Sequence, residues 1–264
     1  MSPSRLAPFA FIATGTVLGS YATAVYVDEM KRKRLRERLR SSWDSHRRHY
    51  SPEFSLKREW AKLSSSQQTI YSIIALNSAV FIAWKVPACS RILNRYFLHA
   101  INSHPLGMLG SIFSHRSLTH LAFNMLALNS FGSFLHDRMG REHFCAFYLS
   151  AGTASSFGSH LYKCFRLNFT PSLGASGAIF GIVGACGHFP SLKVSLILLP
   201  VHSIPISTAL PVLMGVDLIG LVKNWSIFDH AAHLSGAAYG YLAFPFSEQI
   251  WSNRRLIVKY ISPP

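Results

Sequence analysis

Long stretches without charge restrict what this chain can fold into more than any other feature of its sequence. Leu6–Val27 contains no charged residue, and Leu192–Val222 contains one Lys and one Asp. A helix rises ~1.5 Å per residue, so about 20 apolar residues cross a hydrocarbon core ~30 Å thick. Only 14% of the residues are charged, against ~25% in a typical soluble domain. The sequence therefore predicts an all-α, polytopic membrane protein.

Seven segments are candidates for membrane-spanning helices. They are Leu6–Val27, Thr69–Trp84, Leu118–Leu135, Phe144–Tyr162, Gly174–Phe189, Ile204–Val222 and His230–Phe246. The apolar stretch Leu192–Leu199 is too short to cross, and we expect Pro87–Arg116, which mixes aromatic and polar residues, to lie at the membrane interface. The expected organisation is an N-terminal helix with a basic linker at residues 1–67, a helical core at 68–247 and a short tail at 248–264.

The basic residues are concentrated after the first apolar stretch. The net charge is +15, and residues 28–67 hold twelve Lys or Arg against six Asp or Glu. The block Lys31–Arg40 carries no interleaved aromatic residues on which bases would stack, so it favours anionic lipid headgroups over nucleic acid. We expect the lipid bilayer as a partner and no nucleic-acid binding.

The four cysteines show no spacing typical of a metal site and no Cys-x-x-Cys pair. They are Cys89, Cys145, Cys164 and Cys186. Three of them lie in or beside apolar segments, where cysteine behaves as a small apolar residue. We therefore expect unpaired packing residues, with a disulfide as the alternative, and we expect neither a metal nor a cofactor.

The fifth segment, Gly174–Phe189, contains a serine near its start. A serine in a membrane helix is usually a packing residue, and Gly177 and Gly181 have ordinary helix-contact spacing. The segment is only 16 residues long, or roughly 24 Å, so the helix must begin below the membrane surface. Its irregular lead-in, Thr170-Pro171-Ser172-Leu173, must then be buried in protein or line water. The length therefore places Ser176 at a helix N-terminus facing a wet cavity, as a candidate nucleophile.

The last segment contains a histidine within an apolar helix, where ionisable residues are functional by default. His233, Gly236 and Gly240 follow at i, i+3 and i+7 and share one stripe. The fifth segment has a matching row of small residues, Gly177, Gly181 and Gly184. Close approach of the two helices would bring a hydroxyl and an imidazole to ~2.6–3.2 Å. We predict His233 as the base for Ser176; the alternative is a hydrogen-bond donor between helices.

A third polar pair, His120 and Asn124, lies near the start of the third segment. The spacing of i and i+4 puts both on one helix face, and both can donate hydrogen bonds to an oxyanion. The alternative is a polar clamp between helices. If the basic linker faces inside, the third, fifth and seventh segments all run inward. His120, Ser176 and His233 then share one depth, which indicates a single site.

Together these motifs resemble those of the rhomboid intramembrane proteases. The shared patterns are a Gly-x-Ser-Gly serine (Gly174, Ser176, Gly177), a His-x-x-x-Asn pair (His120, Asn124) and an Ala-His-x-x-Gly-x-x-x-Gly helix (Ala232, His233, Gly236, Gly240). The similarity covers most of the chain and is greatest with mitochondrial members of the family. It implies a six-helix catalytic core at 68–247, preceded by one extra transmembrane helix, in the mitochondrial inner membrane.

The resemblance also implies an endopeptidase with a Ser176–His233 dyad that cuts single-span membrane proteins in or near their transmembrane helices. It assigns the oxyanion to His120, Asn124 and the backbone N–H of Ser176. Phe180 stands where many relatives have a tyrosine, so it can stack on the imidazole but offers no hydroxyl. A kinked segment such as residues 204–222 resembles the one through which substrates are thought to enter sideways. A homo-oligomer or a scaffold partner stays open.

Two acidic residues near these motifs receive structural interpretations. Asp217 is expected to be a buried acid bonded to backbone or Ser/Thr groups, and Asp229 to lie at the water interface. No carboxylate is then expected to orient His233, and His230 is a weaker candidate for any role.

Two other classes of protein compete with the protease. A non-catalytic rhomboid relative would be expected to lose the serine or the histidine, and this chain keeps both. A transporter or channel would need polar residues that trace a path across the membrane. No His-Glu-x-x-His zinc motif is present.

Overall fold

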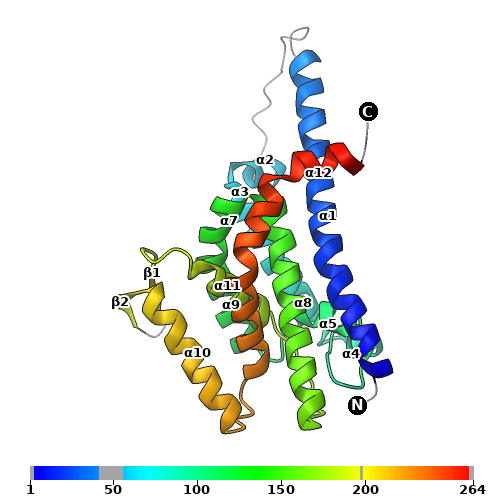
Figure 1. Ribbon diagram of the computed structural model, residues 1–264, viewed down its shortest axis with the longest axis vertical. Helices are drawn as coiled ribbons and strands as arrows, with labels where there is room; N and C mark the ends of the chain where they lie inside the picture. Colours follow the sequence, from blue (N-terminus) through cyan, green and yellow to red (C-terminus); the bar gives the residue numbers. More distant parts are fainter. Residues whose placement is uncertain (1–2, 42–55, 197–198, 262–264) are drawn as a thin grey trace.

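The computed structural model describes residues 3–41, 56–196 and 199–261. Helices dominate, and the long ones run side by side in one bundle (Figure 1). The α-helices are α1 (Pro3–Ser41), α2 (Leu56–Lys62), α3 (Ser65–Ala83), α4 (Ser90–Tyr96), α5 (Gly107–Gly110), α6 (Leu118–Ala127), α7 (Ser133–Met139), α8 (Arg141–Arg166), α9 (Ser176–Cys186), α10 (Ile206–Val222), α11 (His230–Ser252) and α12 (Arg254–Ile261). Further helical turns are η2 (Pro87–Cys89), η3 (Ser111–Phe113) and the π-helical η4 (Leu128–Gly132).

Each of the seven predicted segments contains helix in the structure. Leu118–Leu135, for example, forms α6, η4 and the start of α7 in succession. The first helix does not end with its apolar stretch at Val27 but continues through the basic block to Ser41, because Arg, Lys, Leu and Glu all favour helix. The central part of the expected linker, residues 42–55, lies outside the described residues.

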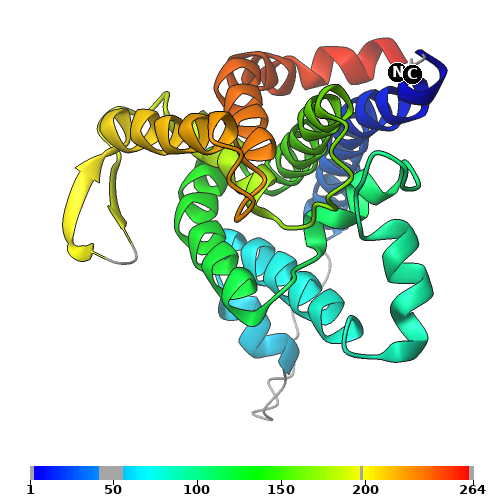
Figure 2. The ribbon, with the colours of Figure 1, turned by 90° about the horizontal axis from the view of Figure 1, so that it is seen from below.

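A β-hairpin between α9 and α10 is the departure from an all-α fold in the described part of the chain. β1 (Lys193–Leu196) pairs antiparallel with β2 (Leu199–Pro205), and Val194 faces Ile204. The hairpin projects beyond α10, away from the other helices (Figure 2). Apolar β-branched residues favour strands, which explains why this stretch, too short to cross a membrane, pairs with its neighbour.

The described helices differ in how well they satisfy the length and composition of a membrane span. Leu6–Leu39 does so by itself, and Ser65–Ala83 does so together with Pro87–Tyr96, at a bend of 102°. Ser176–Cys186 and Ile206–Val222 are apolar but shorter. The multi-pass arrangement, and the six-helix core with one extra helix, therefore stay predictions.

Helix α9 lies at the centre of the bundle and packs closely against α11. A Cβ on Gly236 would lie 2.2 Å from the carbonyl oxygen of Gly177, and one on Gly240 would lie 1.8 Å from that of Gly181. The two rows of small residues that the sequence analysis singled out are therefore in contact. Only the absence of side chains allows the two backbones to approach so closely.

We expect Gly240→Ala to lower the free energy of unfolding by roughly 1–3 kcal/mol, because the added methyl forces two packed helices apart. Unfolding by denaturant in detergent micelles measures the change. Gly215→Ala on α10 is the matched control, since a Cβ there meets nothing within 4 Å and alanine favours helix over glycine. Equal stability of the two variants would contradict the prediction.

The N-terminal helix α1 packs along α8, the long helix of the core (Figure 1). The hydroxyls of Ser20 and Ser150 lie 3.0 Å apart, and Phe9 stacks on the ring of His160 with centroids 3.9 Å apart. The first helix is therefore in direct contact with the bundle that holds the candidate site.

Candidate active site

The N-terminal ends of α6, α9 and α11 meet at a cavity of about 810 Å³. Its lining includes His120 from α6, Ser176 from α9 and His233 from α11. The structure thus brings together the three residues that the sequence analysis placed at one depth.

Side-chain caps fix where two of these helices begin. Ser117 accepts a hydrogen bond from the backbone N–H of His120 at 3.2 Å, and Asp229 accepts one from the N–H of Ala232 at 3.0 Å. Such caps satisfy N–H groups that the first turn of a helix leaves unpaired. The positions of His120 and His233 in the first turns of their helices are therefore set by local sequence.

The chain reaches Ser176, the first residue of α9, through a constrained lead-in. Gly174 has a φ of +142°, which residues with a Cβ rarely adopt, and a Cβ there would lie 2.9 Å from the ring of His120. The N–H of Ala175 donates to Nε2 of His115 at 3.5 Å. Irregular backbone inside a protein needs such partners. His115 was not predicted from the sequence.

His233 lies between the serine and a carboxylate. Its Nε2 is 2.9 Å from Oγ of Ser176, and its Nδ1 is 3.0 Å from Oδ1 of Asp217. Because a carboxylate only accepts, Nδ1–H donates to Asp217, and Nε2 offers its lone pair to the Ser176 hydroxyl. Phe180 stacks on the imidazole with centroids 4.2 Å apart. The ring is held in the tautomer and orientation of a general base.

The expectation that no carboxylate orients His233 is wrong. Asp217 is 5% exposed, and its Oδ1 accepts from the Nδ1 atoms of His230 at 2.6 Å and of His233 at 3.0 Å. Within the described part of the chain its hydrogen-bond partners are therefore two imidazoles, and not the backbone or Ser/Thr groups that we expected. The sequence signal was an acid within an apolar segment. The sequence did not reveal that His233 is the partner of Asp217, because the two residues lie on different helices, α10 and α11.

The same three side chains place possible metal-ligand atoms within 4.8 Å of one another. Both Nδ1 atoms already hydrogen-bond to Oδ1 of Asp217, and a metal would have to displace both Nδ1 protons. Asp217, His230 and His233 therefore form a hydrogen-bonded unit centred on the Asp217 carboxylate.

The predicted oxyanion donors differ in position. His120 lines the cavity beside Ser176. Asn124, one turn further along α6, is buried and donates one amide N–H to the carbonyl of His120 at 2.9 Å. It is absent from the described residues that line the cavity. The structure therefore brings His120 to the nucleophile but leaves Asn124 bonded within its own helix.

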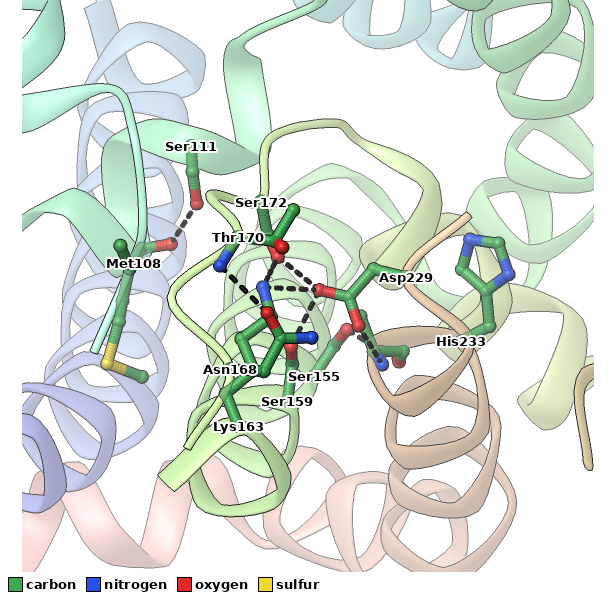
Figure 3. Close-up of polar contacts among 12 residues, drawn as sticks. Met108, Ser111, Ser155, Ser159, Lys163, Asn168, Thr170, Ser172, Asp229 and His233 are labelled. Atoms are coloured by element: carbon green, nitrogen blue, oxygen red, sulfur yellow. Dashed lines mark hydrogen bonds and ion pairs between the residues drawn. The ribbon is translucent and has the colours of Figure 1, made fainter. Parts of the chain in front are cut away.

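A second polar cluster, around Asp229, lies beside His233 (Figure 3). The side chain of Asp229, which we expected at the water interface, is only 21% exposed and forms an ion pair of 3.1 Å with Lys163. Burial raises the pKa of the Asp229 carboxyl, but the Lys163 ammonium and the hydroxyls of Ser159 and Ser172 outweigh it and lower the pKa to about 2. Sequence reasoning missed Lys163, because a lysine at the end of an apolar segment ordinarily extends to the headgroups.

Serine hydrolases carry out acyl transfer with a serine hydroxyl that is hydrogen-bonded to an imidazole, which in turn is hydrogen-bonded to a buried carboxylate. Ser176, His233 and Asp217 have this arrangement. Fold and site together define the class: a helical protein with the side-chain constellation of a serine hydrolase at a central cavity.

The chain belongs to the rhomboid family. Residues 102–247 match the Rhomboid domain. The chain is 38% identical over 268 residues to the mitochondrial presenilin-associated rhomboid-like protein of Mus musculus, covering 96% of this chain and 70% of that protein. It is 42% identical over 206 residues to presenilin-associated rhomboid-like protein A, mitochondrial, of Danio rerio, covering 76% of this chain and 54% of that protein. Rhomboid protease GluP of Bacillus subtilis is 35% identical over 136 residues, 52% of this chain and 25% of that protein. The chain thus spans about half the length of the Danio rerio relative.

Proposed function

We propose that this protein is an intramembrane serine endopeptidase, with Ser176 as nucleophile and His233 as general base. The observation that carries the proposal is the 2.9 Å separation of Oγ of Ser176 and Nε2 of His233 at the edge of a cavity. Membership of a family that contains a protein named as a rhomboid protease supports the reaction class.

In the proposed reaction, Oγ of Ser176 attacks the carbonyl carbon of a peptide bond while its proton passes to Nε2 of His233. The imidazolium then gives this proton to the leaving amine, and an acyl-enzyme remains. A water molecule in the cavity attacks the ester, again with His233 as base, and releases the carboxylic acid. Asp217 keeps the proton on Nδ1 and stabilises the imidazolium. Asp217 thus extends the dyad by a third, orienting member.

The oxyanion of the tetrahedral intermediate forms next to the first turn of α9. The backbone N–H of Ser176 is one of the groups that a helix N-terminus leaves free for an anion. His120 supplies a side-chain donor from the cavity wall. Asn124 would contribute only if its side chain rotates away from the carbonyl of His120 and turns an amide N–H towards the oxyanion.

The proposed substrates are single-span membrane proteins, cut in or near the transmembrane helix. The substrate helix must unwind at the cut, because an intact helix hides its carbonyls in internal hydrogen bonds. The loop at residues 223–229 contributes Trp225 and Phe228 to the cavity wall, and they are 49% and 58% exposed. These aromatic side chains could cap the cavity once a substrate segment has entered past α10.

We further propose a multi-pass location in a mitochondrial membrane, the inner one. The relatives from Mus musculus, Rattus norvegicus and Saccharomyces cerevisiae are named as mitochondrial. The lipid bilayer and the substrate are the expected partners; nucleic acid is not, and a homo-oligomer or a scaffold partner stays open.

A fluorophosphonate probe tests the nucleophile without requiring a known substrate. The probe phosphonylates an activated serine oxygen: an O–P bond forms, the P–F bond breaks, and fluoride and the serine proton leave. We therefore expect an adduct on Ser176 in the wild type and none in Ser176→Ala. Peptide mass spectrometry locates the adduct. Ser72→Ala is the matched control, because Ser72 is exposed on α3 and bonds only to the carbonyl of Gln68 at 2.7 Å among the described contacts. An unlabelled wild type, or a label that survives Ser176→Ala, would overturn the proposal.

A further inference from the structure

Lys163 is a buried cation beside the cavity. It lies in the last turn of α8, its side chain is 6% exposed, and it lines the same cavity as Ser176 and His233. Ionisable side chains in such positions are costly unless they are paired, and a cation that is kept there has a specific partner.

The partner joins Lys163 to two other segments of the chain (Figure 3). The ammonium forms an ion pair of 3.1 Å with Oδ2 of Asp229 and donates to the hydroxyl of Ser172. The same Oδ2 accepts from Ser159 Oγ at 2.6 Å and from Ser172 Oγ, so the carboxylate is fully engaged. Its Oδ1 caps α11 by accepting the N–H of Ala232 at 3.0 Å.

The two segments that meet at Lys163 are those that present the nucleophile and the base. Ser172 precedes Ser176 by four residues, and Asp229 precedes His233 by four. The backbone of Ser172 is also paired with His99, with N–H to carbonyl distances of 3.0 and 2.7 Å in the two directions. The lead-in to α9 is therefore held from two sides.

We propose that Lys163 and Asp229 form a positioning clamp that sets the separation between Ser176 and His233. The inference rests on the proposed function and deepens it. Lys163 touches neither reacting group in the described contacts; it acts by holding the lead-in of α9 and the first turn of α11 in fixed relation. A displacement of ~1 Å between reacting groups can lower a rate by about 10²-fold, so a small shift in either segment suffices.

The test removes the charge of Lys163 or of Asp229 and keeps the approximate size of each side chain. Lys163→Met keeps most of the side-chain volume, and Asp229→Asn keeps a good helix cap. In liposomes with a single-span reporter, we expect each variant to lower kcat by about 10- to 100-fold with KM changed less than about twofold, because the clamp orients reacting groups. The rate of fluorophosphonate labelling should fall in parallel, since it reports on Ser176 without a substrate helix.

The double variant Lys163→Met/Asp229→Asn separates a clamp from two independent effects. Because the two side chains act as one unit, its kcat should be no lower than that of the worse single variant. Lys163→Arg, which keeps the charge, should recover part of the labelling rate. Lys62→Met is the matched control, since it breaks an exposed ion pair of 2.7 Å with Glu59 and should leave both rates unchanged.

The outcomes distinguish the clamp from the protease itself. If the wild type is labelled, and both single variants keep its labelling rate and its kcat, the clamp alone is overturned. A rise in KM without a fall in kcat, or multiplicative losses in the double variant, would overturn it too. No labelling of the wild type would overturn the proposed function and the clamp together. If Lys163→Met does not fold, Asp229→Asn decides alone by the same two rates.

Discussion

Ser176→Ala and His233→Ala are each expected to abolish cleavage of a single-span substrate in reconstituted liposomes. Without Oγ there is no atom to form the acyl-enzyme, and without Nε2 there is no acceptor for the serine proton 2.9 Å away. Loss of either member of such a pair costs about 10⁴-fold or more, and the two losses are not additive. Gel analysis of the product from purified wild type and variants measures the effect.

Two controls separate chemistry from folding in this experiment. Ser72→Ala and His188→Ala change exposed residues of the same types that do not line the cavity. The His188 ring hydrogen-bonds to the carbonyl of Tyr241, which is not a cavity-lining residue either, so both variants should cleave at the wild-type rate. Equal cleavage by all variants would point to a contaminating protease or a wrong site. A wild type that binds the substrate helix without cutting it would favour the non-catalytic rhomboid relative.

Asp217→Asn is expected to lower kcat by about 10²- to 10⁴-fold while the protein stays folded. An asparagine amide can donate to Nδ1 of His233, which moves the imidazole proton to Nε2 and removes the lone pair that Ser176 needs. The comparison is made on kcat and KM in liposomes, with KM expected to change little because Asp217 faces the imidazoles and not the substrate.

Asp137→Asn is the matched control for this substitution, since the Asp137 side chain is 65% exposed. Full activity of Asp217→Asn would show that His233 works without an orienting carboxylate, as the resemblance to a Ser–His dyad implied. A fall in activity that accompanies a loss of folded protein would instead assign Asp217 to stability. Circular dichroism and the unfolding midpoint distinguish these results.

The position of the candidate nucleophile and base followed from the sequence because it depends on local properties. The shortness of the apolar segment around Ser176 predicted a helix that begins at this serine, and helical periodicity put His233, Gly236 and Gly240 on one stripe. The contact of Gly240 with the backbone of Gly181 has the same origin. A row of residues without side chains can be recognised in one helix before its partner is known.

The roles of Asp217 and Lys163, which support the candidate site, could be recognised only from the tertiary structure. Asp217 is a lone acid on an apolar helix, and its contact with His233 across 16 residues of sequence depends on how α10 is rotated against α11. Lys163 is ambiguous in the same way, because its long side chain could reach headgroups or turn inward. Spacing along a helix determines which residues share a face. Only the packing of helices and loops decides what each face meets, and that packing turned Asp217 and Lys163 towards the site.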